Sequence, residues 1–331
     1  MNQKSNQTSW AVGFDLGGTN LRAALVSEHG KVRARYSRNT FAERGPDAVI
    51  EEIIDLIKEV LKKGHRKVAS IGVAAPGPLD PGTGIIIKSP NLKWTNVPLK
   101  KCLEDNLNIP VIVDNDSQMT AFGEKWLGAG RGANNLLCLA LGTGVGGGVI
   151  FNGHIFHGET GSAGHIGHHI LDPNGPKCGC GAHGCLESYV SAPNIVRRTL
   201  DAINTNRRAT LIPQYVNGDL KRLTAYHIFQ AARDQDPLAM EIFEETGYYI
   251  GLTLASIIPI LDPKLVIISG QVAQSGDLLL KPIRSHLDRI LHLRHPVPVL
   301  QAQLGDNGGL IGAAGVAFSR LGECSSRTKG V

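Results

Sequence analysis

The histidine and cysteine residues between positions 168 and 185 have the spacing of a metal site. His168, Cys178, Cys180 and Cys185 form the pattern H-x9-C-x-C-x4-C, with four glycines around the cysteines. One imidazole and three thiolates are a tetrahedral zinc set, and because the protein fills all four positions, the ion would be structural. The alternative is a loop of free thiols, which would leave a long segment without support. The pattern favours zinc.

A second group of candidate residues follows an apolar stretch, IPVIV. Asp114, Asn115 and Asp116 come directly after it, and α/β proteins build active sites at the carboxyl ends of strands. A carboxylate there could accept the proton of a hydroxyl group during phosphoryl transfer, and Asp116 is the candidate base. On local pattern alone, these residues could equally well cap the helix predicted for residues 117–126.

Two glycine-rich turns each lie between two predicted strands. Their candidate phosphate-binding residues are Asp15, Gly17, Gly18, Thr19 and Asn20 in the first turn and Gly142, Thr143 and Gly144 in the second. Backbone N–H groups in such turns can bind phosphate oxygens, and Asp15 could orient hydrated Mg²⁺, although a simple tight turn is the alternative. A strand follows the second turn, which argues against a dinucleotide-binding fold, and no P-loop motif occurs. The two similar units indicate a duplicated architecture.

The elements that must position these residues alternate between strand and helix. Residues 46–64 carry apolar side chains at helical spacing, and residues 237–260 and 308–322 are also predicted helices. Buried strands that end in polar turns are predicted within residues 68–80 and 109–117. This alternation predicts an α/β fold, and 331 residues exceed the usual size of one core, so we expect two lobes around a cleft.

Composition excludes several classes of protein. Hydrophobic residues make up 42% and charged residues 19% of the chain, which is ordinary globular composition. The net charge of +5 is small, and we interpret the basic cluster Lys62 to Lys67 as a solvated helix end, so nucleic acid is not an expected partner. No apolar run reaches the ~18 residues of a membrane span and the start lacks a secretion signal, so we expect a cytoplasmic protein.

The motifs resemble those of a known family. DLGGTN at 15–20 followed by LGTGVGGG at 141–148 is similar to the phosphate motifs of the actin, sugar kinase and heat-shock ATPase fold. The stretch AGHIGHHILDPNGPKCGCGAHGCLESY at 163–189 closely resembles the ROK (repressor, open reading frame, kinase) family. The resemblance implies an actin-like, ribonuclease H-like ATPase fold. Its smaller lobe would hold residues 10–117 plus 308–322, and its larger lobe residues 118–307 with a zinc loop at 165–187.

The resemblance also implies roles for single residues. It makes Asp116 the catalytic base and His168 both a zinc ligand and a sugar contact. Further sugar contacts would be Gly77, Asn91, Asn115 and Glu187, and Gly270 would lie in the adenosine motif. The chain departs from the family pattern at His165, where a sugar-binding Glu is usual, and at Gln118, Ser269 and Gln271.

Taken together, the motifs predict an ATP-dependent hexose kinase with Mg²⁺ bound to ATP, structural zinc, and glucose as the acceptor. N-acetylmannosamine, mannose, fructose and allose are alternative acceptors within the family, and polyphosphate is an alternative donor. A sugar-binding protein without catalysis, a ROK repressor and a zinc hydrolase are the rival classes. The repressor would need a helix-turn-helix domain, and about ten residues precede the first turn. Relatives are commonly dimers or tetramers, so we expect a homo-oligomer.

Overall fold

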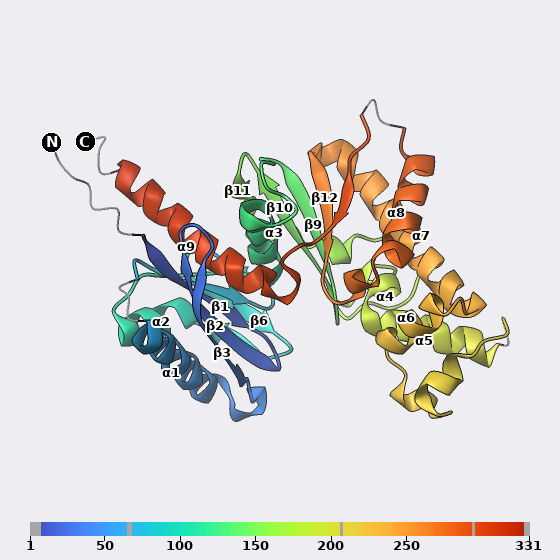
Figure 1. Cartoon of the computed structure of the whole chain (residues 1–331), viewed down its shortest axis with the longest axis horizontal. Helices are drawn as coiled ribbons and strands as arrows, with labels where there is room; N and C mark the ends of the chain where they lie inside the picture. The colour runs from blue at the N-terminus through green and yellow to red at the C-terminus, as the bar shows by residue number, and fades with distance from the viewer. Residues whose placement is uncertain (1–7, 65–67, 206–207, 293–294, 328–331) are drawn as a thin grey trace.

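Two five-stranded sheets form the centre of the molecule (Figure 1). The computed structural model describes residues 8–64, 68–205, 208–292 and 295–327. The first sheet contains β1 (Trp10–Leu16), β2 (Asn20–Ser27), β3 (Val32–Asn39), β4 (Ile71–Ala75) and β8 (Val111–Asn115). The second contains β9 (Leu136–Leu141), β10 (Val145–Phe151), β11 (His154–Ile155), β12 (Leu265–Ser269) and β13 (Val299–Gln301).

The two sheets have the same topology. Their strand orders are β3-β2-β1-β4-β8 and β11-β10-β9-β12-β13. In each, the first three strands form an antiparallel meander and the last two join in parallel. The predicted duplication is therefore confirmed. A small third sheet of β5 (Leu79–Asp80), β6 (Ile85–Ser89) and β7 (Trp94–Val97) lies beyond the end of β4.

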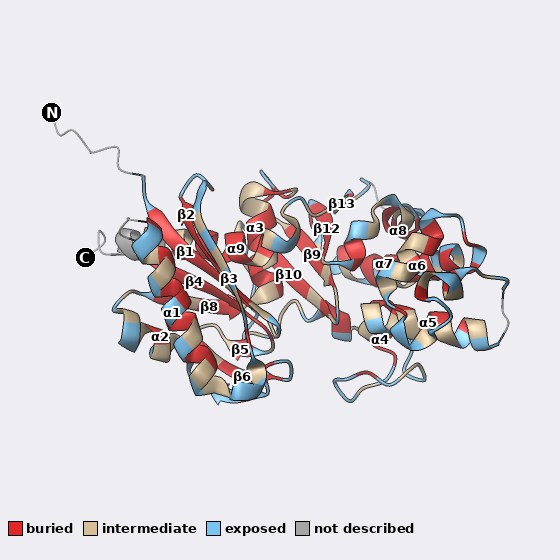
Figure 2. Ribbon diagram, turned by 60° about the horizontal axis from the view of Figure 1, so that its bottom comes forward, coloured by how far each residue is buried: buried red, intermediate tan, exposed pale blue. Residues whose placement is uncertain are grey.

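Helices cover both faces of the first sheet. Successive residues of its strands face opposite sides, so each side packs against a different helix. Val12 and Phe14 of β1 belong to the apolar core that includes the inner side of α1 (Pro46–Gly64). Between them, Gly13 faces α9 (Gly308–Arg327) on the opposite side of the sheet. Strand β4 is accordingly buried throughout its length, and β1 is buried except at the half-buried Asp15 (Figure 2).

The second sheet is covered in the same way. Leu137 and Leu139 of β9 pack in a core with α7 (Pro237–Leu261) and α8 (Asp277–Ile290). Cys138, between them, packs with α3 (Asp116–Leu127) on the other face. The remaining helices are α2 (Leu99–Leu107), α4 (Glu187–Val190), α5 (Ala192–Asn204) and α6 (Ala225–Arg233), and short 3-10 turns lie at 42–44, 166–168, 212–216, 220–222, 272–275 and 305–307.

The helix boundaries agree with the sequence pattern. The predicted helix at 46–64 has the same limits as α1, and the predicted helix at 237–260 is one residue shorter than α7. Lys62 and Lys63 lie in the last turn of α1, while residues 65–67 of the predicted basic cluster lie outside the described residues. Within the described part of the chain, no helix is both long and apolar enough to cross a membrane.

Helices α3 and α9 lie between the two sheets and pack against each other at very short range. A Cβ at Gly312 of α9 would lie 1.7 Å from the carbonyl oxygen of Met119, and one at Gly123 of α3 would lie 2.6 Å from that of Gly308. Backbone atoms cannot give way to a methyl group as a flexible side chain can, so both positions require glycine. This contact sets the distance between the sheets.

Replacing Gly312 with Ala should therefore lower the free energy of unfolding by about 3 kcal/mol, because the added methyl group forces the two helices apart. Thermal and urea unfolding would measure the effect. Gly82→Ala is the matched control, since its Cβ would meet only Asp80 Oδ1, at 3.2 Å in an exposed turn. Equal stability of the two variants would contradict this account of the helix contact.

Candidate active site

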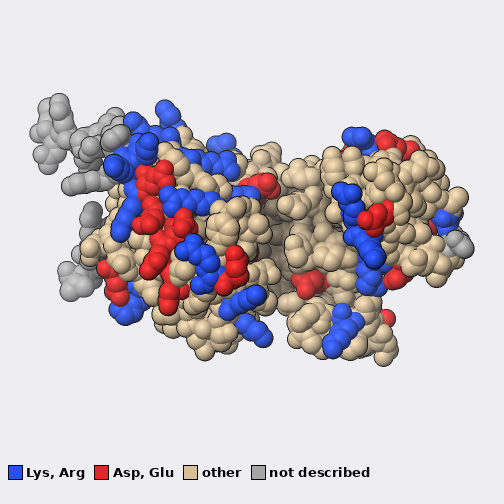
Figure 3. All heavy atoms as spheres, turned by 90° about the horizontal axis from the view of Figure 1, so that it is seen from below, with Lys and Arg blue, Asp and Glu red and all other residues tan. Residues whose placement is uncertain are grey.

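A cavity of about 950 Å³ lies between the two halves of the molecule. On the face seen in Figure 3, the surface is hollowed there, and positive and negative side chains are interspersed on the half formed by the first sheet. Among the residues of the described chain that line the cavity are Asp15, Arg22, Gly77, Ser89, Asn91, Asp114, Asn115, Asp116, Gln118, Gly142, Thr143, Gly144, His157, His165, His168, Cys180, Glu187, Gly270 and Asp306. Residues from both sheets and from the cysteine-rich loop therefore meet at one site.

Asp116 stands at the junction of β8 and α3, half-buried in the wall of this cavity. Its Oδ1 accepts hydrogen bonds from the backbone N–H of Ser117 at 2.7 Å and from the Ser117 hydroxyl at 3.2 Å. Burial raises the pKa of Asp116 above its ordinary value, although the bonds from Ser117 oppose the rise. A carboxylate with a raised pKa is a stronger proton acceptor than an ordinary aspartate.

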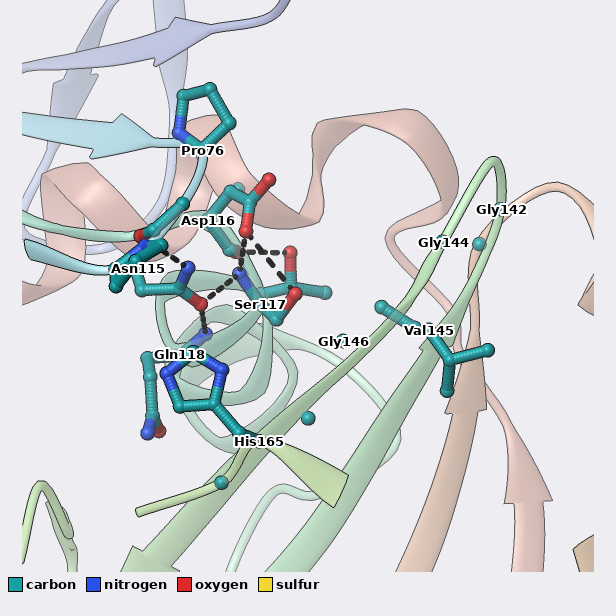
Figure 4. A pocket seen from close by; sticks show the side chains of 18 of the residues that line it. Pro76, Asn115, Asp116, Ser117, Gln118, Gly142, Gly144, Val145, Gly146 and His165 are labelled. Atoms are coloured by element: carbon teal, nitrogen blue, oxygen red, sulfur yellow. Dashed lines mark hydrogen bonds between the residues drawn. The ribbon is translucent and has the colours of Figure 1, made fainter. Parts of the chain in front are cut away.

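At the junction of β8 and α3, Asn115 both caps the helix and lines the cavity. Asn115, the residue before α3, caps the helix, since its side-chain oxygen accepts from the N–H groups of Ser117 and Gln118. Its amide nitrogen lies 3.4 Å from the carbonyl oxygen of Gly77, toward which it points. Figure 4 shows Asn115 and Asp116 on one side of the pocket and the hairpin with Gly142 and Gly144 on the other.

Asp15, at the end of β1, is surrounded by other charged groups. Asp116 and Asp306 are near enough to raise its pKa by repulsion, and the guanidinium of Arg22 lies 3.9 Å from its Oδ2. Burial first and then the charge of Asp116 raise the pKa of Asp15 to about 6, while Arg22 opposes the rise. A Cβ at Gly309, in the first turn of α9, would lie 3.3 Å from Asp15 Oδ1, so the start of this helix faces the carboxylate.

The rest of the first glycine turn is not among the residues that line the cavity. The N–H of Gly17 donates to the carbonyl oxygen of Asn20, which closes the turn. Thr19 accepts from the N–H of Thr40, and a Cβ at Gly18 would lie 3.0 Å from the Cβ of Asn91. The turn thus packs behind Asn91 on the first sheet.

The second glycine turn lines the cavity throughout. The N–H of Gly142 donates to the carbonyl oxygen of Gly144, and Thr143 is exposed at the tip between them. Glu187, at the start of α4, accepts from the N–H of Val145 at 2.8 Å. Gly270 has a φ of +88°, and a Cβ there would lie 2.3 Å from the carbonyl oxygen of Leu141, so only glycine fits beside this strand.

The predicted zinc ligands converge. The ligand atoms of His168, Cys178, Cys180 and Cys185 all lie within 4.8 Å of one another. Cys178 Sγ is 3.8 Å from His168 Nδ1, and Cys180 Sγ is 3.7 Å from Cys185 Sγ. A tetrahedron with metal–sulfur bonds of about 2.3 Å has edges of about 3.8 Å, so the donor set fits zinc. His168 and Cys180 also line the cavity, while Cys178 and Cys185 are buried behind it.

His165 lies in the cavity wall beside this cluster. Its ring is stacked on that of His168, with the ring centroids 6.3 Å apart. Partial burial, and then the neighbouring His168, lower the pKa of His165, so the imidazole is neutral at neutral pH. A neutral imidazole offers one donor and one acceptor where the family usually has a carboxylate.

Sequence reasoning missed several residues of this site. Arg22 and Asp306 line the cavity but lie in a strand and in a short turn that carry no motif. His157 contacts the buried carboxylate of Asp114 and lines the cavity. No local spacing pattern marks Arg22, Asp306 or His157. Trp94 packs in the core of the first sheet with 1% of its surface exposed.

Two sheets of identical topology, with two glycine hairpins and a shared cavity between them, define the actin-like ATPase fold in its sugar-kinase form. The ROK family model matches residues 11–319, and the chain belongs to this family. The predicted fold class is confirmed.

Individual relatives are similar over nearly the whole chain. A glucokinase of Halalkalibacterium halodurans is 37% identical over 92% of this chain and 93% of that protein, and a glucokinase of Thermotoga maritima is 36% identical over 94% and 98%. Among solved structures, a ROK family glucokinase from Streptomyces griseus in complex with glucose and AMPPNP has a TM-score of 0.82 and 33% identity, covering 94% of this chain and 100% of that one.

From the burial of Asp15 and the negative charges near it, we predict how its ionisation affects the free energy of unfolding. Its folded pKa of about 6 lies above its ordinary value of 3.8, so ionisation of this carboxylate destabilises the fold as pH rises from about 4 to about 6. Asp15→Asn removes the charge, and in nucleotide-free protein without added Mg²⁺ it should raise the free energy of unfolding at pH 7.5 by up to about 3 kcal/mol.

The same comparison at low pH supplies the control. As pH falls below 3.8 the aspartate becomes mostly neutral in the unfolded chain as well as in the folded one, so most of the gain from Asp15→Asn should be lost by pH 3.5. Urea unfolding of both proteins between pH 3.5 and 7.5 measures this. A gain that stays constant with pH would show that repulsion at Asp15 is not its cause.

Proposed function

We propose that this chain catalyses the ATP-dependent phosphorylation of a hexose, with glucose as the acceptor and glucose 6-phosphate as the product. The observation that carries the proposal is the single cavity in which the Asn115–Asp116 corner faces the hairpin of Gly142 and Gly144. Such an arrangement offers a base to a hydroxyl group on one side and backbone N–H groups to a phosphate on the other. The glucokinases among its relatives support glucose as the acceptor.

Asp116 acts as the base in this mechanism. It accepts the proton of the O6 hydroxyl as that oxygen bonds to the γ-phosphorus, and the bond from phosphorus to the bridging oxygen of ADP breaks. Asn115 orients the sugar, and the raised pKa of Asp116 helps it to take the proton. Asn91, Gly77, His165, His168 and Glu187 form the rest of the sugar site.

The nucleotide is held by the hairpins and by the adenosine motif. N–H groups around Gly142, Thr143 and Gly144 bind phosphate oxygens, and Gly270 leaves room for the nucleotide beside β12. Asp15 would hold hydrated Mg²⁺, which would neutralise phosphate charge. The raised pKa of Asp15 supports this role, since carboxylates that repel one another are relieved by a cation. Gly17, Gly18, Thr19 and Asn20 shape the turn that supports this wall.

His168, Cys178, Cys180 and Cys185 would hold zinc, which would stabilise the loop that carries His168. The protein supplies all four ligands, so the ion would be structural and leave no position for a reacting water. The loop then presents His168 to the sugar while fixing Glu187, which contacts both Cys178 Sγ at 3.7 Å and the second hairpin.

We also propose that residues 10–117 with 308–322 and residues 118–307 form two lobes that close over the substrates. Closure would exclude water and so prevent hydrolysis of ATP. A cytoplasmic location, assembly into a dimer or tetramer, and the absence of a nucleic-acid partner stay predictions. Fructose, mannose, allose and N-acetylmannosamine are the alternative acceptors and polyphosphate the alternative donor, and a phosphorylation screen crossing donors with sugars distinguishes them.

Replacing Asp116 with Asn should reduce kcat for glucose at least about a thousandfold, because the amide cannot accept the hydroxyl proton. The sugar affinity should change little, since Asn keeps the size and hydrogen-bonding shape of the side chain. Coupled assay of ADP release and equilibrium dialysis of labelled glucose measure the two quantities. Asp105→Asn, at an exposed position of α2, is the control and should match the wild type. Near-normal turnover of Asp116→Asn would refute the assignment of the base.

The zinc assignment predicts one zinc ion per chain in protein purified without chelators. Cys185→Ser should lose the ion and lower the melting temperature, because an oxygen cannot replace a buried thiolate in the tetrahedral set. Elemental analysis and thermal unfolding measure this. Cys102→Ser, at a cysteine outside the cluster, should keep the full zinc content. Equal zinc content in the two variants would rule out this ligand set.

A further inference from the structure

Two buried polar side chains flank the proposed base at equal distances along the chain. Asp114 lies two residues before Asp116 and is 1% exposed, and Gln118 lies two residues after it and is 3% exposed. Each makes hydrogen bonds to the segment 156–165, which is more than thirty-five residues away in sequence and ends at His165. The proposed base and the histidine at the family's sugar-binding glutamate position are thus linked through neighbouring side chains.

The amide of Gln118 is almost fully used in this link. Its Nε2 donates to the carbonyl oxygen of Ala163 at 2.8 Å and lies 3.5 Å from that of Phe156. Its Oε1 accepts from the N–H of Val149 in β10 at 3.1 Å. One side chain of α3 therefore ties a strand of the second sheet to both ends of the segment.

The backbone next to His165 packs directly against the side-chain amide of Gln118. Gly164, with a φ of +91°, would place a Cβ only 2.7 Å from Gln118 Nε2, so this glycine lets the segment lie directly against the side chain. The carbonyl oxygen of Gly164 then accepts from the N–H of Ile166, which begins the turn that leads to His168. Figure 4 shows Gln118 and His165 on the same side of the pocket, below Asn115.

Asp114 provides a second anchor for the segment. Its Oδ2 lies 2.7 Å from Nε2 of His157, and its Oδ1 accepts from the N–H of Asn115. The carbonyl oxygen of His157 accepts from the N–H of Ala163, so the segment folds back on itself between the two anchors. A buried carboxylate requires such a partner, since an unpaired charge inside a protein is costly.

We propose that Gln118 is a positioning residue for the sugar site: it holds the segment 156–165 so that His165 faces the acceptor held by Asn115 and Asp116. The kinetic consequences of this inference rest on the proposed sugar kinase activity. The clamp, meaning the hydrogen bonds by which Gln118 holds the segment, does not depend on that activity. Members of the ROK family often have Asn at this position, and in this chain the longer Gln118 side chain occurs together with His165 in place of Glu. The two departures lie in contact through Gly164 and act on the same wall of the cavity.

Gln118→Met tests the clamp, because methionine keeps the length of the side chain but has no amide. We expect KM for glucose to rise about tenfold, since the carbonyl oxygen of Ala163 and the N–H of Val149 lose their partner and the segment shifts. KM for ATP should stay within about twofold, because among the described residues no hydrogen bond joins Gly142, Thr143 or Gly144 to the segment 156–165. Gln118→Glu separates the two bonds: it keeps an acceptor for Val149 and loses the donor to Ala163, and it should raise KM for glucose to a similar extent.

Gln301→Met is the matched control. Gln301 lies in β13, outside the cavity lining, and its Nε2 donates to the carbonyl oxygen of Ala273 at 2.9 Å. The variant loses the same kind of hydrogen bond and should leave KM for glucose unchanged. A general loss of stability would affect both methionine variants alike, whereas a positioning role affects only Gln118→Met.

Hydrogen exchange gives a readout that does not depend on activity. The N–H of Phe156 donates to the carbonyl oxygen of Val149 in β10, and the N–H of Ala163 donates to that of His157. Both N–H groups should exchange about tenfold faster in Gln118→Met than in the wild type or in Gln301→Met. Unchanged exchange there would overturn the clamp even if the wild type phosphorylated no hexose, a result that would separately refute the proposed function. Faster exchange with an unchanged KM for glucose would overturn the positioning role.

Discussion

The close contact between α3 and α9 is the constraint on which the active site depends. Gly123 and Gly312 let the two backbones approach so closely that the sheets behind them share one cavity. Both helices begin at this cavity, α3 at Asp116 and α9 at Gly308. Their positive N-terminal ends therefore point toward the place where negative charge must be bound. Glu124 secures the far end of α3, since its buried carboxylate accepts from the N–H groups of Gln303 and Leu304, just before α9.

Several carboxylates lie close together at this cavity, and their negative charge destabilises the folded protein when no ligand is bound. Burial, and then the negative charges of Asp116 and Asp306, raise the pKa of Asp15 to about 6. Arg22 offsets only part of this, because its guanidinium also donates to the carbonyl oxygen of Asp306. A hydrated Mg²⁺ held at Asp15, as proposed above, would offset this negative charge.

The cysteine-rich loop and the second hairpin form one unit through Glu187. One oxygen of this carboxylate accepts from the N–H of Val145, and the other lies near Cys178 in the metal cluster. A displacement of the loop would therefore affect both His168, the proposed sugar contact, and the turn at Gly144. Structural zinc in this position would set the geometry of chemistry in which it takes no part.

Local features of this chain could be predicted from the sequence, because they depend on neighbours in sequence. The metal ligands occupy eighteen consecutive residues, the limits of α1 follow from its apolar spacing, and each glycine turn joins two adjacent strands. The tertiary structure alone decided which side chains meet across long separations. Gln118 contacts a residue forty-five positions away, and His157 one forty-three positions away. Such contacts arise from the packing of α3 against β10, and no periodicity or spacing along the chain encodes a contact between elements that meet only when both sheets have formed.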